Sequence, residues 1–155
     1  MRCLLFITCL ATLAGCASTT LDTEFIAIEP VNETKTDSGT DGESRVVDVR
    51  VYQLKDDAKF TAATVEAIWS DAEGTLGDSM ISVKLGESIF PEKADGPRNG
   101  KTITLDPLDS KTRFIGVLAL FSDADDGPRK VVVPLDQADS VLFELTGYHI
   151  TVKQQ

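Results

Sequence analysis

Few residues in this chain could do chemistry, and its three cysteines are the first of them. Cys3 and Cys9 lie in an N-terminal segment that has one basic residue, Arg2, then an apolar run, then small residues. That order is typical of a secretory signal with its cleavage site. The apolar run is too short for a transmembrane helix, which needs about 20 residues. We therefore expect residues 1–15 to be removed as a signal peptide, which leaves Cys16 as the one cysteine.

Cys16 ends the tetrapeptide Leu13-Ala14-Gly15-Cys16. An ordinary signal peptide could end beside a cysteine by chance, but exported proteins normally pair their cysteines or have none, so a lone thiol needs a use. The tetrapeptide resembles the lipobox of bacterial lipoproteins, in which the cysteine is lipidated and becomes the first mature residue. A protein with one acyl chain binds a membrane only marginally, whereas two or more chains anchor the protein stably. We expect diacylglyceryl and N-acyl (palmitate) lipid on Cys16.

The residues after Cys16 indicate which membrane the lipid enters. By the sorting rule of enteric bacteria, an aspartate directly after the cysteine retains a lipoprotein at the inner membrane, and here that residue is Ala17. The sequence therefore predicts a lipid-anchored protein on the periplasmic face of the outer membrane. Residues 16–21 would form the lipidated cysteine and a short tether.

The single histidine, His149, is not expected to be catalytic or to bind a metal. It lies on a terminal strand with parity opposite to its apolar neighbours, which places it toward solvent. One histidine without a cysteine or a second histidine cannot build a typical transition-metal site. The sequence also has no Gly-x-Ser-x-Gly, Ser-x-x-Lys or phosphate-binding glycine motif. We predict that the protein is not an enzyme and that it has no catalytic residue, cofactor or small-molecule substrate.

Two turns are rich in carboxylates that could bind calcium, since hard cations use several oxygens converging from loops. Neither has the full spacing of a calcium-binding loop, and Asp-Gly is also common turn chemistry, so we predict no metal site. A C2-like periplasmic module that binds calcium or another ligand through these loops is the alternative function. The residues concerned are Asp37, Asp41 and Glu43 in one turn and Asp123, Asp125 and Asp126 in the other.

The overall charge limits the possible partners. The formal net charge of the chain is −10, and removal of Arg2 with the signal makes it one unit more negative. Such a charge repels nucleic acid and anionic lipid surfaces. Residues 22–155 are enough for one domain and too few for two.

The first half of this domain contains two predicted strands, a long loop and a helix. Alternating apolar residues predict strands over 23–29, ended by Pro30, and over 45–54. The intervening residues 31–44 are turn formers with one apolar residue, and a loop of this length is usually functional or disordered. A helix is predicted from an N-cap at Thr61 to Gly74, with Phe60 and Val65 as a hydrophobic staple and Trp69 in the core.

The second half consists of predicted strands separated by turns. The strands are expected at 79–85, with an edge piece at 89–90, and at 101–105, 112–121, 130–134, 141–145 and 148–152. Residues 91–100 and 122–129 read as loops. Gly116 indicates a bulge or a close backbone approach within a central strand. Thr146-Gly147 is either a two-residue hairpin turn or a bulge at Gly147. The fold class is therefore all-β, an antiparallel sandwich of two sheets with one short inserted helix.

Several segments, taken in order, resemble the TssJ (SciN) family, the outer-membrane lipoproteins of bacterial type VI secretion. They are the lipobox, the strand at 46–55, the helix at 60–71, the Leu-Gly-Asp at 76–78 and the strand at 112–121. The family often has Asn-Pro-Asp and Gly-Arg-Pro-Ser-Pro in the loop after the first strand, and only Asn32 and Ser44 match that pattern here.

The resemblance implies a fold and a partner. The fold is a sandwich similar to transthyretin or C2 domains with an extra helix. The implied function is a lipid-anchored structural subunit of the type VI membrane complex, which binds the periplasmic C-terminal domain of a TssM-like inner-membrane protein. The loop between the first two strands is the implied contact, which makes the candidate partner-binding residues Val31, Asn32, Glu33, Thr34, Lys35, Thr36, Asp37, Ser38, Gly39, Thr40, Asp41, Gly42, Glu43 and Ser44.

Overall fold

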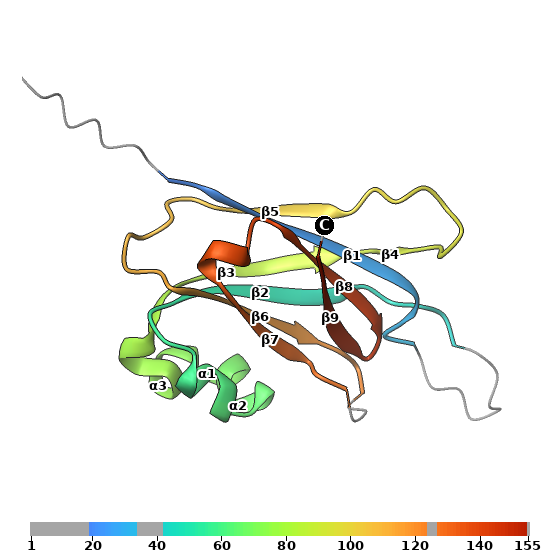
Figure 1. Cartoon of the computed structure of the whole chain (residues 1–155). Coiled ribbons are helices and arrows are strands. Elements are labelled where there is room, and N and C mark those ends of the chain that lie inside the picture. The colour runs from blue at the N-terminus through green and yellow to red at the C-terminus, as the bar shows by residue number, and fades with distance from the viewer. Residues whose placement is uncertain (1–18, 34–41, 124–126, 155) are drawn as a thin grey trace, which may run out of the picture.

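A computed structural model describes residues 19–33, 42–123 and 127–154 of the 155-residue chain (Figure 1). Several sequence predictions lie outside the described residues. They are the signal peptide at 1–15, the lipidated Cys16, the loop residues 34–41 with Asp37 and Asp41, and Asp125 and Asp126.

The described residues form two β-sheets that pack face to face, which confirms the all-β sandwich. The five-stranded sheet has the order β4-β1-β8-β9, with β5 also paired to β1. Its strands are β1 (Leu21–Val31), β4 (Pro91–Glu92), β5 (Lys101–Leu105), β8 (Val141–Gly147) and β9 (His149–Gln154). The four-stranded sheet has the order β3-β2-β6-β7. It contains β2 (Val47–Leu54), β3 (Met80–Ile89), β6 (Phe114–Leu120) and β7 (Lys130–Pro134).

Most of the pairing is antiparallel, but β1 runs parallel to both β4 and β8. The main core lies between the sheets, because alternate residues of each strand point inward. Val49 and Val51 of β2 and Val117 of β6 are fully buried there, and Phe25 stacks on Phe143 with ring centroids 5.0 Å apart.

β1 is longer than the sequence predicted, because Pro30 does not end it. The strand continues to Val31, and its pairing with β8 shifts register between Ala27 and Val31. A proline, which lacks an N–H, is tolerated in such an irregular stretch because no ladder bond is lost there. β1 therefore runs directly into the loop.

The single predicted helix is three short helices, α1 (Ala58–Ala62), α2 (Val65–Ser70) and α3 (Ala72–Leu76), followed by a 3-10 turn, η1 (Gly77–Ser79). The N-cap predicted at Thr61 was wrong, since this residue lies inside α1. The caps are the side chains of Thr64 and Asp71, which accept hydrogen bonds from the amides of Ala67 and Gly74. Each cap begins a new helix, which is why the segment is broken.

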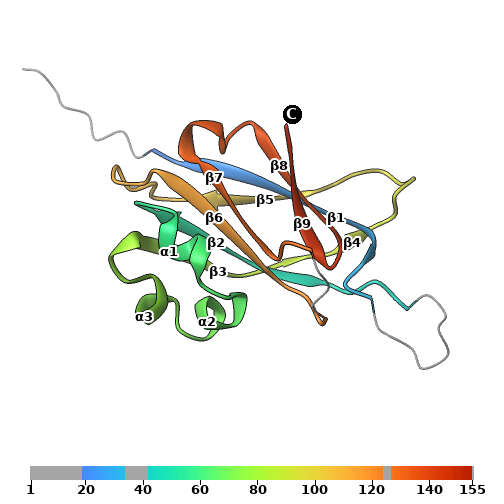
Figure 2. The ribbon, with the colours of Figure 1, turned by 60° about the horizontal axis from the view of Figure 1, so that its bottom comes forward.

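The helices cover part of the outer face of the four-stranded sheet (Figure 2). Phe60, Ile68 and Leu76 pack on Tyr52 and Leu118 in a second apolar cluster, with Trp69 half-buried against it. None of the helices in the described ranges is long and apolar enough to cross a membrane.

Four further details differ from or sharpen the sequence predictions. Residues 91–92 form β4 rather than the start of a loop. The pairing of β6 with both neighbours is continuous across Gly116, so this residue is not a bulge. A Cβ there would lie 3.0 Å from Leu54 and Phe60, so Gly116 permits a close approach. Thr146 pairs with His149, so the hairpin turn is Gly147-Tyr148, one residue later than predicted. A second 3-10 turn, η2 (Leu135–Gln137), follows β7.

Candidate functional site: the loop end of the sandwich

The start of β1 and the two stems of the predicted binding loop lie at opposite ends of the sandwich (Figure 1). The chain enters at Thr19, whose carbonyl accepts a hydrogen bond from the amide of Leu108 at 2.8 Å. The 11 residues of β1 then cross the whole sheet, a span of roughly 35 Å at the usual rise per residue. The loop begins where β1 ends, so one strand joins the two ends covalently.

Asn32 fixes the base of this loop to three other segments. Its side-chain amide donates to the carbonyl of Val46 at 2.8 Å, and its side-chain oxygen accepts from the amide of Ser122 at 2.6 Å. Its backbone amide donates to the carbonyl of Gly147 at 2.7 Å. Asn32 has a positive φ of 49°, a conformation that asparagine adopts more readily than most residues. The loop base, the turn after β6 and the β8–β9 hairpin are therefore one structural unit.

The other residues that flank the loop strengthen this unit. The amide of Val31 donates to the Ser44 hydroxyl oxygen at 3.2 Å, and the amide of Arg45 donates to the Val31 carbonyl at 3.1 Å. The Tyr148 hydroxyl donates to the Glu33 carbonyl at 3.0 Å. Both stems of the loop are thus held in place, although residues 34–41 lie outside the described residues.

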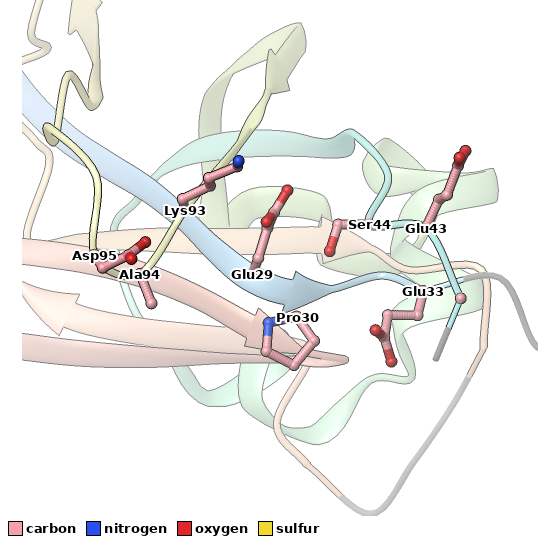
Figure 3. Close-up of a pocket in the computed structure, with 9 residues that line it drawn as sticks. Glu29, Pro30, Glu33, Glu43, Ser44, Lys93, Ala94 and Asp95 are labelled. Carbon is pink, nitrogen blue, oxygen red and sulfur yellow. The ribbon is translucent and has the colours of Figure 1, made fainter. Parts of the chain in front are cut away.

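An acidic groove of about 630 Å³ lies beside the loop stems (Figure 3). Its walls come from the end of β1, from the second stem of the loop and from the segment after β4. Four carboxylates and one lysine line it, so its local charge is negative. The lining residues are Glu29, Pro30, Glu33, Gly42, Glu43, Ser44, Lys93, Ala94 and Asp95.

The structure divides the described part of the predicted partner-binding set into two groups. Val31 is fully buried and Asn32 is 5% exposed, so neither presents its side chain to a partner. The other four line the acidic groove: Glu33, Gly42, Glu43 and Ser44.

Sequence reasoning missed the groove wall formed by Lys93, Ala94 and Asp95. It also missed the structural role of Tyr148, whose hydroxyl holds the first loop stem. The wall begins 49 residues after the last loop residue, Ser44, and no sequence pattern connects the two. The Gly147 turn was the one signal that pointed to the hairpin.

Within the described residues, no three or more histidine, cysteine, aspartate or glutamate side chains are close enough to hold a metal ion. His149 is half-buried rather than fully solvent-facing, and it lies directly after the hairpin turn. Glu43 and Asp123 of the two aspartate-rich turns are described, while their neighbours Asp41 and Asp125 are not.

Comparison with known proteins gives a consistent result. The family model for type VI secretion lipoproteins (VasD, EvfM, TssJ) matches residues 19–155. A search of curated proteins found no match.

Several solved structures have the same fold. Serratia marcescens Lip, a membrane-bound component of the type VI secretion system, is 20% identical with a TM-score of 0.71, and the alignment covers 89% of this chain and 98% of Lip. The lipoprotein TssJ1 from Pseudomonas aeruginosa is 21% identical with a TM-score of 0.68, over 89% of this chain and 97% of TssJ1. A chain in a structure described as the TssM C-terminal domain (869-1107) from EAEC is 24% identical, with a TM-score of 0.67. The alignment covers 88% of this chain and 98% of the matched chain.

Proposed function

Because the chain belongs to the family of type VI secretion lipoproteins, we propose that it tethers the type VI membrane complex to the outer membrane. In this proposal residues 1–15 are removed, and lipid on Cys16 holds the protein on the periplasmic face. Residues 16–21 form the tether to one sandwich domain, residues 22–155. The loop at 31–44 binds the periplasmic C-terminal domain of a TssM-like inner-membrane protein.

The observation that carries the proposal is that the chain enters the sandwich at the end opposite to the loop. The chain enters the sandwich at one end, and β1 delivers it to the loop at the other end (Figure 1). A tether needs this arrangement, because a load between membrane and partner then follows the covalent backbone of β1. Noncovalent contacts between strands would carry less of it.

The likeness to known structures supports the choice of partner. One similar chain occurs in a structure described as the TssM C-terminal domain from EAEC. Since 88% of this 155-residue chain covers 98% of the matched chain, the matched chain is too short to be the 869–1107 fragment itself. We infer that a relative with this fold accompanies TssM in that structure, and we extend the same pairing to this protein.

In this role the protein acts as a structural subunit of the membrane complex. Such a subunit needs no catalytic residue, cofactor or small-molecule substrate, and the matched family is one of type VI secretion lipoproteins. The lipid on Cys16 is a covalent anchor rather than a cofactor.

The loop assignment is tested by replacing residues 34–41 with glycine and serine at unchanged length. This change leaves the hydrogen bonds of Val31, Asn32, Glu33 and Ser44 in place. We expect calorimetry to show loss of binding to the TssM-like periplasmic domain, with an unchanged thermal melt.

A matched control is Glu73→Ser on α3, far from the loop, because both changes remove one net negative charge. The control should bind like the wild type. Wild-type affinity in the loop variant would show that the contact lies elsewhere.

A further inference from the structure

Three large apolar side chains stand exposed in a row beside the loop. Phe90 is 68% exposed, Val46 is 37% exposed and Leu120 is 36% exposed. We call them the apolar row. Most of the other large apolar side chains in the described residues are buried or half-buried, so the row is unusual on this molecule.

Strand register places the apolar row on the outer face of the four-stranded sheet. Val47 pairs with Ile89 and both are buried in the main core. Val46 directly precedes β2 and Phe90 directly follows β3, so by the alternation of side chains we place both on the opposite face. Leu120 lies between the core residues Ala119 and Phe121 and pairs with Asp48, so it faces outward as well. The row thus lies at the loop-side ends of three neighbouring strands, β3, β2 and β6.

Among the described residues, the helices cover the same face only at the end where β1 begins (Figure 2). There the three helices bury Tyr52, Leu54 and Leu118. Arg50 lies at the boundary of this cover, with its guanidinium carbon 3.6 Å from the centre of the Trp69 ring. Beyond Arg50 the face carries no cover from the described residues, and the apolar row stands at that end.

Asn32 connects the apolar row to the loop. Its side chain bonds to the carbonyl of Val46, a member of the row, and to the amide of Ser122, two residues after Leu120. A surface groove of about 560 Å³ runs between them and is lined by Asn32, Ser44, Val46 and Leu120 among others. The loop stem, Val46 and Leu120 therefore form one continuous surface, and Phe90 is next in the chain to Pro91, which also lines the groove.

We propose that the apolar row is the second half of the partner-binding surface, occupied by apolar side chains of the same TssM-like periplasmic domain that binds the loop. This inference rests on the proposed function. A lipid bilayer is disfavoured as the occupant because the tether enters at the opposite end. A second copy of the chain is disfavoured because the adjacent acidic groove, with Glu29, Glu33 and Glu43, would approach its own equivalent.

The row should contribute a large share of the affinity. Large side chains that become fully desolvated at an interface are the usual hot spots, and truncating one commonly weakens binding tenfold or more. Phe90 has the most surface left to bury. Burial of apolar surface also makes the heat-capacity change of binding negative.

The test is Phe90→Ser, with Leu120→Thr as a second variant and Leu85→Ser as the matched control. Leu85 lies on β3, the strand that ends directly before Phe90, and it is 57% exposed but outside the row. Binding to the TssM-like periplasmic domain is measured by calorimetry at several temperatures, beside the wild type and the 34–41 replacement. Thermal melts and sedimentation report folding and oligomeric state.

We expect Phe90→Ser and Leu120→Thr to weaken binding about tenfold or more and to make the heat-capacity change less negative. Leu85→Ser should match the wild type. Folded variants with wild-type affinity would show that the apolar row does not bind the partner, while leaving the loop assignment intact. Absence of binding by the wild type would refute the proposed function itself. A wild-type dimer that Phe90→Ser dissolves would also overturn the proposal, because the row would then serve self-association.

Discussion

At the scale of single residues, the loop end depends on side-chain hydrogen bonds made within the fold. Asn32 was a candidate contact in the sequence, but its amide is used entirely within the fold, on Val46 and Ser122. Ser44 likewise accepts a hydrogen bond from Val31. These are the two loop residues that match the family pattern. Their role here is to hold the loop stems against the sheet, so that the exposed residues present a fixed surface.

Substitution of Asn32 should separate its hydrogen bonds from its backbone conformation. Asn32→Gly keeps the positive φ but removes the side-chain hydrogen bonds to the Val46 carbonyl and the Ser122 amide, and at about 1 kcal/mol for each bond should lower the free energy of unfolding by about 2 kcal/mol. Asn32→Ala should cost about 1 kcal/mol beyond that, because alanine disfavours positive φ.

Urea unfolding measures both values, and hydrogen exchange should show a faster Ser122 amide in each variant. Equal stability of Asn32→Ala and the wild type would contradict the assignment of Asn32 as the residue that fixes the loop base.

At the scale of elements, the helical insertion is held on the sheet by three basic side chains from neighbouring strands and loops. Arg50 stacks on Trp69 and donates to its carbonyl at 2.8 Å. Lys130 donates to the carbonyls of Phe60 and Thr61 at 2.7 Å, and burial lowers its pKa below the ordinary value. Arg129 pairs with Glu66 at 2.8 Å; a backbone hydrogen bond and then Arg129 lower the pKa of the Glu66 carboxyl. Two of the three cations thus satisfy carbonyls near helix ends.

Arg50→Ala should loosen this insertion without opening the sandwich. It removes a cation–π contact and a charged hydrogen bond, so we expect a loss of about 2 kcal/mol in the free energy of unfolding. Hydrogen exchange should quicken in α2 and not in β6.

Arg50→Lys keeps the charge but not the planar stack, and should fall between alanine and the wild type. Arg98→Ala, in the exposed segment after β4, is the control. An alanine variant at position 50 with the stability and exchange of the wild type would contradict this role.

The elements show how much of the fold could be predicted from the sequence. Strands β5 and β7 were predicted with their observed ends. Apolar residues alternate in β5, which stops at Asp106-Pro107, and β7 is bounded by the turn at 122–129 and by Pro134. The insertion was predicted as one helix, because its apolar spacing is helical throughout. The caps at Thr64 and Asp71 that divide it act through local hydrogen bonds that this spacing does not reveal. The loop was found from its composition and length. The groove wall at Lys93, Ala94 and Asp95 and the apolar row depend on which strands become neighbours, and no local pattern encodes that.

At the scale of the whole molecule, we propose that the protein couples lipid at one end to a protein partner at the other. β1 joins the two ends, the parallel pairing with β8 holds it within the larger sheet, and Asn32 fixes the point where it leaves the sheet. The acidic surface suits this arrangement, because it keeps the domain from lying on an anionic membrane.

The central claim is that lipid and loop act together, and vesicle flotation tests it most directly. The lipidated protein is reconstituted into phosphatidylethanolamine and phosphatidylglycerol vesicles, and flotation of the TssM-like periplasmic domain is measured. The wild type should carry that domain upward with the vesicles. Cys16→Ser should bind it in solution but fail to float it, and the 34–41 replacement should float without it. Flotation of the domain by the loop replacement, or by Cys16→Ser, would contradict the account.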